Sequence, residues 1–289
     1  MTYEISVSIS KQILDPLLQG PAASAAETAL ITTLEGGRAA LPLLPQVANQ
    51  ALELANNPES SVREFGELVM KDPPIAARFL ATANSALYSR GQTIHSVTDA
   101  VARIGLGGSR DLVFQVVYAS TVSGLKRFQE EVQASFQRSV LCGIICRIGA
   151  PLLRLDIGDA YLCGLLHDIG ESRVYRILSE GKAVPGNEEA TDLVRKHHPR
   201  AGAELAMRWA LPDDIVQVCR RHEEKGAPPT EQLRLVRLAD VLVELVKNAT
   251  DPTALELPEL PEAALAELGV SRDQARAILE RSIAAATKL

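Results

Sequence analysis

Residues 72–88 read DPPIAARFLATANSALY, and this stretch introduces the pattern of the whole chain. Asp72 is a residue type that caps helix N-termini, and Pro73 suits the first helical position, where no backbone N–H donor is needed. The stretch therefore predicts a helix that begins at Pro73. Further along, Ser96 and Asp99 fit the pattern of a capping box, which predicts another helix in SVTDAVARIG.

Helical signals continue on both sides of this stretch. LPLLPQVANQALELANN (41–57) is framed by prolines and asparagines, as one helix would be. Further predicted helices cover 130–150, 157–180, 188–197, 199–210, 212–224 and 231–248, with two short ones in 255–289. Only YEISVSI (3–9) approaches the alternation of a strand, and residues 1–38 carry no motif. The sequence predicts an all-α protein.

Composition argues against nucleic-acid and membrane binding. The 289 residues include 30 Lys and Arg against 36 Asp and Glu, a net charge of −6, whereas general nucleic-acid binding needs a basic surface. The longest apolar stretch, SVLCGIICRIGAPLL (139–153), is interrupted by Arg147 and is too short to span a bilayer. MTYEISVSIS (1–10) has no features of a secretory signal. We therefore expect a cytoplasmic protein.

Two local patterns favour packing over chemistry. The cysteines Cys142, Cys146, Cys163 and Cys219 form no CxxC pair, and we expect them to be core residues. The helices around IGLGGS (104–109) have the form of a helix-turn-helix. However, only Arg110 and Gln115 interrupt the apolar second helix, whereas a recognition helix needs several outward polar side chains. We expect two neighbouring helices of a bundle.

Six segments in order resemble the HDOD domain, a bacterial signalling relative of the HD phosphohydrolases. They are LPLLPQVANQALEL (41–54), MKDPPIAARFLATANSALY (70–88), SVTDAVARIGL (96–106), CGLLHDIGES (163–172), HPRAGAELAMRWALPDDIVQVCRRHEE (198–224) and LRLVRLAD (233–240). The resemblance implies a multi-helix HDOD fold over 39–248. In it, an N-terminal helical subdomain (39–125) packs on an HD-like core (126–248), and 249–289 form a C-terminal helical extension.

The resemblance also implies a cluster of metal-ligating residue types. An active HD site uses a His-Asp doublet, histidines further on and a final Asp. These correspond here to His167, Asp168, His198, His222 and Asp240. Imidazole and carboxylate side by side suit a divalent ion that activates water for attack on a phosphate.

The first His of the family pattern is missing. Its place in the stretch FQRS (136–139) is taken by Arg138, whose guanidinium has no lone pair for a metal. Glu171 stands where catalytic relatives commonly carry Lys. We predict that Arg138 points into the pocket and contacts Asp168 or Asp240, where its charge replaces that of a cation.

Each residue of this cluster also has a purely structural explanation. His167 would be a hydrogen-bonded core histidine, and Asp168 a partner of Arg173 or the cap of a turn. The remaining three would be His198 as the residue before a helix that starts at Pro199, His222 as a helix C-terminus, and Asp240 as an i,i+3 partner of Arg237. His197, which has no family counterpart, would be exposed.

We expect a non-catalytic signal-transduction protein that acts through protein contacts or ligand sensing, with no cofactor. One alternative is a metal-dependent phosphohydrolase acting on a nucleotide or cyclic dinucleotide, with a divalent metal on the five HD residues. Another is a module that binds a cyclic nucleotide second messenger. A protein partner would dock on a patch that includes Asn84, Ser85, Tyr88 and Arg90.

Overall fold

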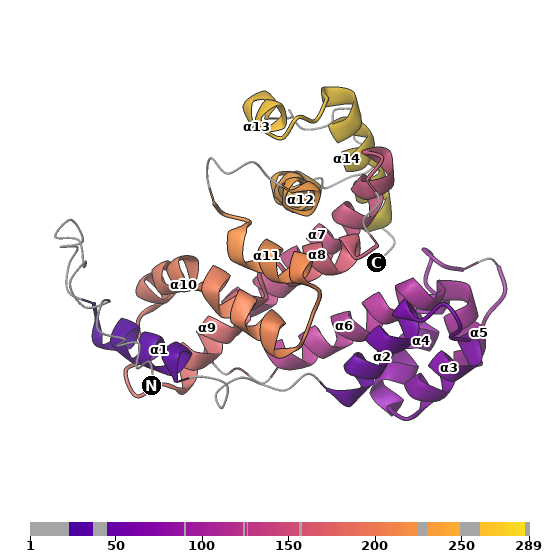
Figure 1. The fold of residues 1–289 in the computed structure, drawn as a ribbon, viewed down its shortest axis with the longest axis horizontal. Coiled ribbons are helices and arrows are strands. Elements are labelled where there is room, and N and C mark those ends of the chain that lie inside the picture. Colours follow the sequence, from indigo (N-terminus) through magenta and orange to yellow (C-terminus); the bar gives the residue numbers. More distant parts are fainter. Residues whose placement is uncertain are drawn as a thin grey trace, which may run out of the picture.

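The computed structural model describes residues 23–36, 45–89, 91–123, 125, 127–155, 158–224, 230–248 and 261–286 (Figure 1). Within these ranges every regular element is a helix, so the all-α prediction is confirmed. No helix in these ranges has the length and apolar character needed to cross a membrane. The strand-like segment 3–9 lies outside them.

Four short helices form an N-terminal lobe, at the right of Figure 1: α2 (Gln46–Asn56), α3 (Val62–Met70), α4 (Pro73–Ala83) and α5 (Val97–Ile104). The predicted start of α4 is confirmed, because an Asp72 carboxylate oxygen accepts the Ile75 N–H at 3.1 Å. Ser96 caps α5 in the same way, by accepting the Asp99 N–H at 3.3 Å. The reciprocal half of a capping box is absent from the α5 cap and present instead at Ser61, ahead of α3.

Helix α6 (Leu106–Val122) runs from this lobe to the middle of the molecule (Figure 1). It follows Gly105, whose φ of +82° allows the chain to turn sharply out of α5. Arg110 is only 5% exposed, and its guanidinium lies 2.6 Å from Asp159, beyond the lobe. A buried Arg110 is not an outward side chain of the kind a recognition helix uses, and α6 packs against α2, α5 and α7 as a neighbouring helix would.

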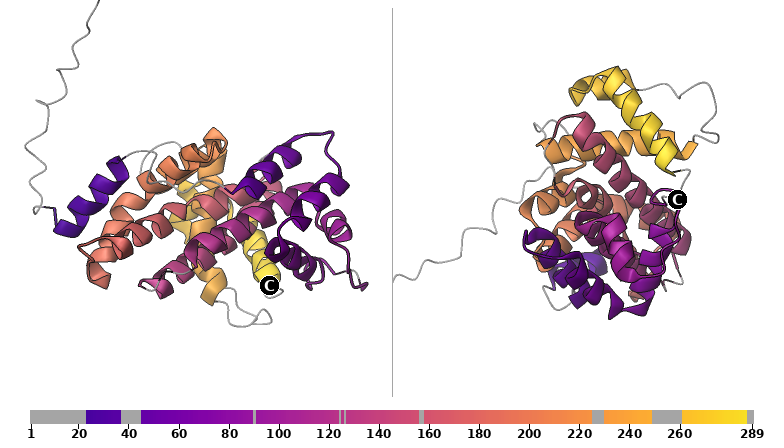
Figure 2. Two further views of the ribbon diagram at one scale, coloured as in Figure 1. Left: turned by 90° about the horizontal axis from the view of Figure 1, so that it is seen from below. Right: turned by 90° about the vertical axis from the view of Figure 1, so that its right-hand side faces the viewer.

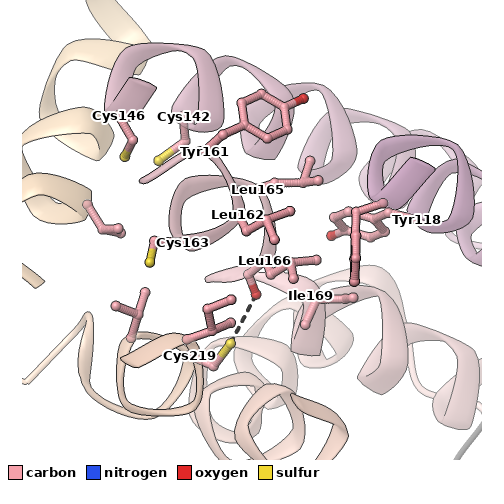
Figure 3. Packing of buried hydrophobic residues seen from close by; sticks show 14 of the residues in the cluster. Tyr118, Cys142, Cys146, Tyr161, Leu162, Cys163, Leu165, Leu166, Ile169 and Cys219 are labelled. Carbon is pink, nitrogen blue, oxygen red and sulfur yellow. Dashed lines mark hydrogen bonds between the residues drawn. The ribbon is translucent and has the colours of Figure 1, made fainter. Parts of the chain in front are cut away.

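The HD-like core contains α7 (Gln129–Leu152), α8 (Ala160–Leu166), α9 (Ile169–Glu180), α10 (Asn187–Arg208), α11 (Asp213–Arg221) and α12 (Glu231–Asn248). Every residue of α8 is buried, and Figure 3 shows its leucines between the cysteines of α7 and Cys219 of α11. All four cysteines are buried and unpaired, as predicted. Gly164 makes this packing possible, because a Cβ there would lie 2.7 Å from the backbone of Cys142.

Three features differ from the predicted helix boundaries. The helix expected over 157–180 is two helices, divided at His167 and Asp168, whereas those expected over 188–197 and 199–210 are one helix, α10. Helix α1 (Ala25–Glu35) was not predicted, although Ser24 accepts the Glu27 N–H as its N-cap. The spacing of Ser24 and Glu27 was a usable signal for this helix.

The C-terminal extension forms α13 (Glu262–Glu267) and α14 (Arg272–Ala286). Figure 2 shows them on one face of the core, where α14 packs on α7 and α12. The chain passes from α6 to α7 between residues 122 and 129, at the predicted joint of the two subdomains. The division into these domains stays a prediction.

Candidate functional site

The HD residues come from separate helices and meet at the centre of the core. His167 and Asp168 lie in the break between α8 and α9, His198 comes from α10, His222 ends α11, and Asp240 comes from α12. All three histidines are buried, with exposed fractions of 5% or less. The structure therefore brings together all five residues that the resemblance implied.

A close approach of two backbones places His198 beside the doublet. A Cβ on Gly170 would lie 2.0 Å from the carbonyl oxygen of His198. Only a glycine allows α9 and α10 to pack this closely. The glycine of the segment HDIG thus has a direct role in assembling the site.

The Nδ1 atom of each of the three histidines faces a backbone carbonyl oxygen. The Nδ1 atoms lie 2.7 Å from the carbonyl oxygen of Gly164 for His167, 2.9 Å from that of Val194 for His198, and 3.1 Å from that of Val218 for His222. A carbonyl oxygen can only accept, so Nδ1 carries the proton in all three rings. The Nε2 atoms are then left to face the centre, which is the arrangement that orients metal-ligating histidines.

Asp168 divides the cluster into two halves. One oxygen, Oδ1, lies 3.1 Å from Nε2 of His222 and 3.4 Å from Nε2 of His198. The other, Oδ2, lies 3.1 Å from Nε2 of His167, which is also 3.1 Å from Asp240. Two groups of ligand atoms result, each spanning no more than 4.8 Å: Asp168, His198 and His222, and Cys142, His167 and Asp240. Both groups could hold a metal ion.

Charge in this pocket favours a cation. Burial lowers the pKa of His167, but Asp168 and Asp240 raise it more, so the net pKa is well above the ordinary value. Conversely, burial raises the pKa of Asp168, and the neighbouring imidazoles lower it well below its ordinary value. Among the described residues, Nε2 of His167 is buried and has no hydrogen-bond partner, although two carboxylates face it. A proton on this nitrogen or a metal ion beside it would satisfy the carboxylates, so the residues fit either.

Arg138, where the resemblance implies the family's first His, enters the pocket from α7. Its Nη2 atom lies 3.0 Å from Oδ2 of Asp168 and 2.8 Å from Glu171. The predicted contact with Asp168 is therefore present. Burial raises the pKa of Glu171, as does the charge of Asp168, while Arg138 lowers it. The two departures from the family pattern thus form one ion pair, a partnership that sequence reasoning missed.

Several of the purely structural explanations are wrong. Arg173 donates to the Ala201 carbonyl and Glu204 and not to Asp168, because it faces α10. Arg237 donates to the carbonyls of residues 221, 222 and 224, which leaves Asp240 to His167.

Two histidine predictions on α10 are also wrong. His198 lies within the helix, because α10 continues through Pro199. The His197 side chain is 12% exposed and pairs with Glu27 of α1 at 3.1 Å, so it is not the exposed residue predicted.

Two residues of the predicted docking patch make hydrogen bonds to the backbone. Asn84 bonds both backbone groups of Ile94 at 2.8 Å, and Ser85 donates to the Thr82 carbonyl at 2.7 Å. Asn84 thus ties the end of α4 to the segment before α5, whereas the Ser85 bond is local to the end of α4. Tyr88 lines a cavity against α6, and Arg90 lies outside the described residues.

A family model of the HDOD domain matches residues 41–225. The chain belongs to the HDOD family. Solved structures with this fold include a Shewanella amazonensis SB2B protein whose assigned name is metal-dependent phosphohydrolase (24% identical, TM-score 0.64, covering 89% of this chain and 97% of that one). Another is a Geobacter sulfurreducens HDOD domain protein of unknown function (23% identical, TM-score 0.60, covering 90% and 89%). At these identities the likeness establishes the fold alone.

Curated relatives extend beyond the shared region. An uncharacterized protein of Treponema pallidum is 26% identical over 211 residues, 67% of this chain and 40% of that protein. Ribonuclease Y of Nitratidesulfovibrio vulgaris is 27% identical over 201 residues, 69% of this chain and 32% of the enzyme. The HDOD chain therefore spans less than half the length of these relatives.

Proposed function

We propose that this HDOD protein is a regulatory signal-transduction module without hydrolase activity, acting through protein contacts or ligand sensing. The contact of Arg138 with Asp168 and Glu171 carries the proposal. An arginine is always protonated and cannot ligate a metal, and here it neutralises the carboxylate that would join two metal sites. The pocket then serves as a buried polar network that stabilises the core.

A role in signalling is supported by family membership. A Marinobacter aquaeolei VT8 protein with the same fold (22% identical, TM-score 0.63, covering 91% of this chain and 65% of that one) is named for signal transduction. Because the chain has an acidic net charge, we expect its partner to be a protein and not nucleic acid in general.

Metal titration tests this proposal. The untagged full chain, stripped with EDTA, would be titrated calorimetrically with Mn²⁺ and then assayed for hydrolysis of bis-p-nitrophenyl phosphate. We expect neither stoichiometric binding nor turnover, whereas Arg138→His, which restores an imidazole, should gain Mn²⁺ binding. Arg195→His on the exposed side of α10 is the matched control and should gain nothing. Tight binding with turnover in the unmodified chain would contradict the proposal.

A second candidate is a metal-dependent phosphohydrolase acting on a nucleotide or cyclic dinucleotide. The observation in its favour is that three Nε2 atoms face the centre with their Nδ1 atoms already bonded to carbonyls. Asp168, His198 and His222 would hold a metal there, with His167 and Asp240 beside it. A divalent ion on these ligands supplies Lewis acidity and an activated water. In that case Arg138 would bind the substrate phosphate, and Arg138→His would abolish turnover of the nucleotide.

A further inference from the structure

A cavity of about 200 Å³ lies between the N-terminal lobe and the HD-like core, and none of the HD residues lines it. Its walls come from α4, α5 and α6 on one side and from α7 and α8 on the other. The loop after α4 adds Tyr88, from one of the six segments that resemble the family. The cavity therefore sits on the joint of the two subdomains.

Two arginines line this cavity, one from each side. Arg78 comes from α4, and Arg147 comes from α7, where its guanidinium lies 5.1 Å above the ring of Tyr161. No hydrogen bond or ion pair of either guanidinium is found among the described residues, although Arg147 lies near enough to Asp111 to affect it: burial raises the pKa of Asp111, and the charges of Arg110 and Arg147 lower it. Stacking on Tyr161 holds the planar guanidinium of Arg147 in place and does not use its N–H donors.

The remaining polar lining also favours an anion. The Tyr161 hydroxyl donates to the side-chain carbonyl of Gln115 at 3.2 Å, which leaves the Gln115 amide NH₂ as a further donor. Asp111 lines the cavity too, but buried Arg110 holds it at 2.8 Å and also reaches Asp159. Together with Arg78 and Arg147, three arginines oppose two aspartates, so one positive charge is left over.

We propose that this cavity binds the phosphate group of a small molecule, held between Arg78 of the N-terminal lobe and Arg147 of the core. Two guanidinium forks and an amide offer more donors than the two oxygens of one carboxylate can accept, whereas a phosphate monoester presents three oxygens. The volume is below the roughly 300–1,000 Å³ of pockets for drug-sized ligands, so the ligand is at most about the size of a mononucleotide.

Such a ligand would couple the two halves of the protein. Its phosphate would bridge α4 and α7, between which the described residues make no hydrogen bond or ion pair of their own. Binding would then favour one packing of the lobe on the core, which is how a ligand shifts a conformational equilibrium. The proposal is independent of whether the HD residues hold a metal.

The test is calorimetric titration of the full chain with inorganic phosphate, AMP and succinate at constant ionic strength. EDTA is present throughout, so that no metal recruits phosphate to the HD residues. We expect phosphate and AMP to bind, and succinate to bind more weakly. Arg78→Gln and Arg147→Gln should each weaken AMP binding by about tenfold or more, since each removes a charge-assisted contact. Arg63→Gln, an exposed arginine of α3, is the matched control and should leave binding unchanged.

Three outcomes would overturn the proposal: no binding of phosphate or AMP at millimolar concentration, equal binding by the glutamine variants and the control, or tighter binding of succinate. Because Arg78 is exposed, Arg78→Gln should fold even if Arg147→Gln does not. Arg147→Lys, which keeps the charge and loses the fork, should bind AMP with an affinity between those of the wild type and Arg147→Gln.

Discussion

Substitution of Arg138 by alanine should destabilise the fold, because it leaves two largely buried carboxylates without their cation. The Asp168 and Glu171 side chains are 8% and 17% exposed, and the guanidinium lies 3.0 Å and 2.8 Å from them. Removing one partner of a buried pair typically costs about 3–5 kcal/mol. The Arg138 side chain is 29% exposed, and His167 supplies positive charge next to Asp168. We therefore expect the free energy of unfolding to fall by an amount at the low end of this range, about 3 kcal/mol at pH 7.

Urea and thermal unfolding followed by circular dichroism would measure this loss. For a chain of this size, 3 kcal/mol corresponds to a fall in Tm of about 6 °C. Arg195→Ala is the control, since Arg195 and Asp192 form an ion pair with side chains 74% and 65% exposed. That pair should contribute less than about 0.5 kcal/mol. If Arg138→Ala and Arg195→Ala unfold at the same urea concentration, the charge replacement inferred for Arg138 is wrong.

Three further predictions concern the core. The pKa of His167 is raised in the folded state, so its stabilising effect is complete below its unfolded value of about 6.5 and is lost as pH rises through the higher folded value. In EDTA, the free energy of unfolding should therefore fall above about pH 7, and His167→Gln should flatten that slope. Gly170→Ala should prevent folding or lower the free energy of urea unfolding by at least about 3 kcal/mol, because the new Cβ would lie 2.0 Å from the His198 carbonyl oxygen. Gly107→Ala is the control and should have no such effect, because the space around Gly107 is open. Burial raises the pKa of all four thiols, those of Cys142, Cys146, Cys163 and Cys219. Ellman's reagent should therefore modify them only when the chain unfolds, and rapid reaction of the native chain would contradict their burial.

Local capping chemistry made the helix starts at Pro73 and Val97 predictable, because a cap is decided by neighbouring residues. The same local reasoning failed at Pro199, which lies inside α10. Proline usually disfavours a helix interior, and here the packing of α10 on α9 overrides that preference. The break at His167 and Asp168 was also missed, since an apolar stretch of helical residues does not reveal where tertiary contacts will divide it.

The sequence alone determined the helical class, because residue types and caps are properties of neighbours along the chain. Its resemblance to the HDOD domain gave the family and implied which residues form the HD cluster. It also predicted a contact of Arg138 with Asp168 or Asp240, since buried carboxylates need a cation, and the structure shows the one with Asp168. Only the tertiary structure decided that Glu171 shares that cation, that all three Nε2 atoms face inward, and that Arg78 and Arg147 meet at one cavity. These facts depend on distances between residues far apart in sequence, which arise only when the helices pack.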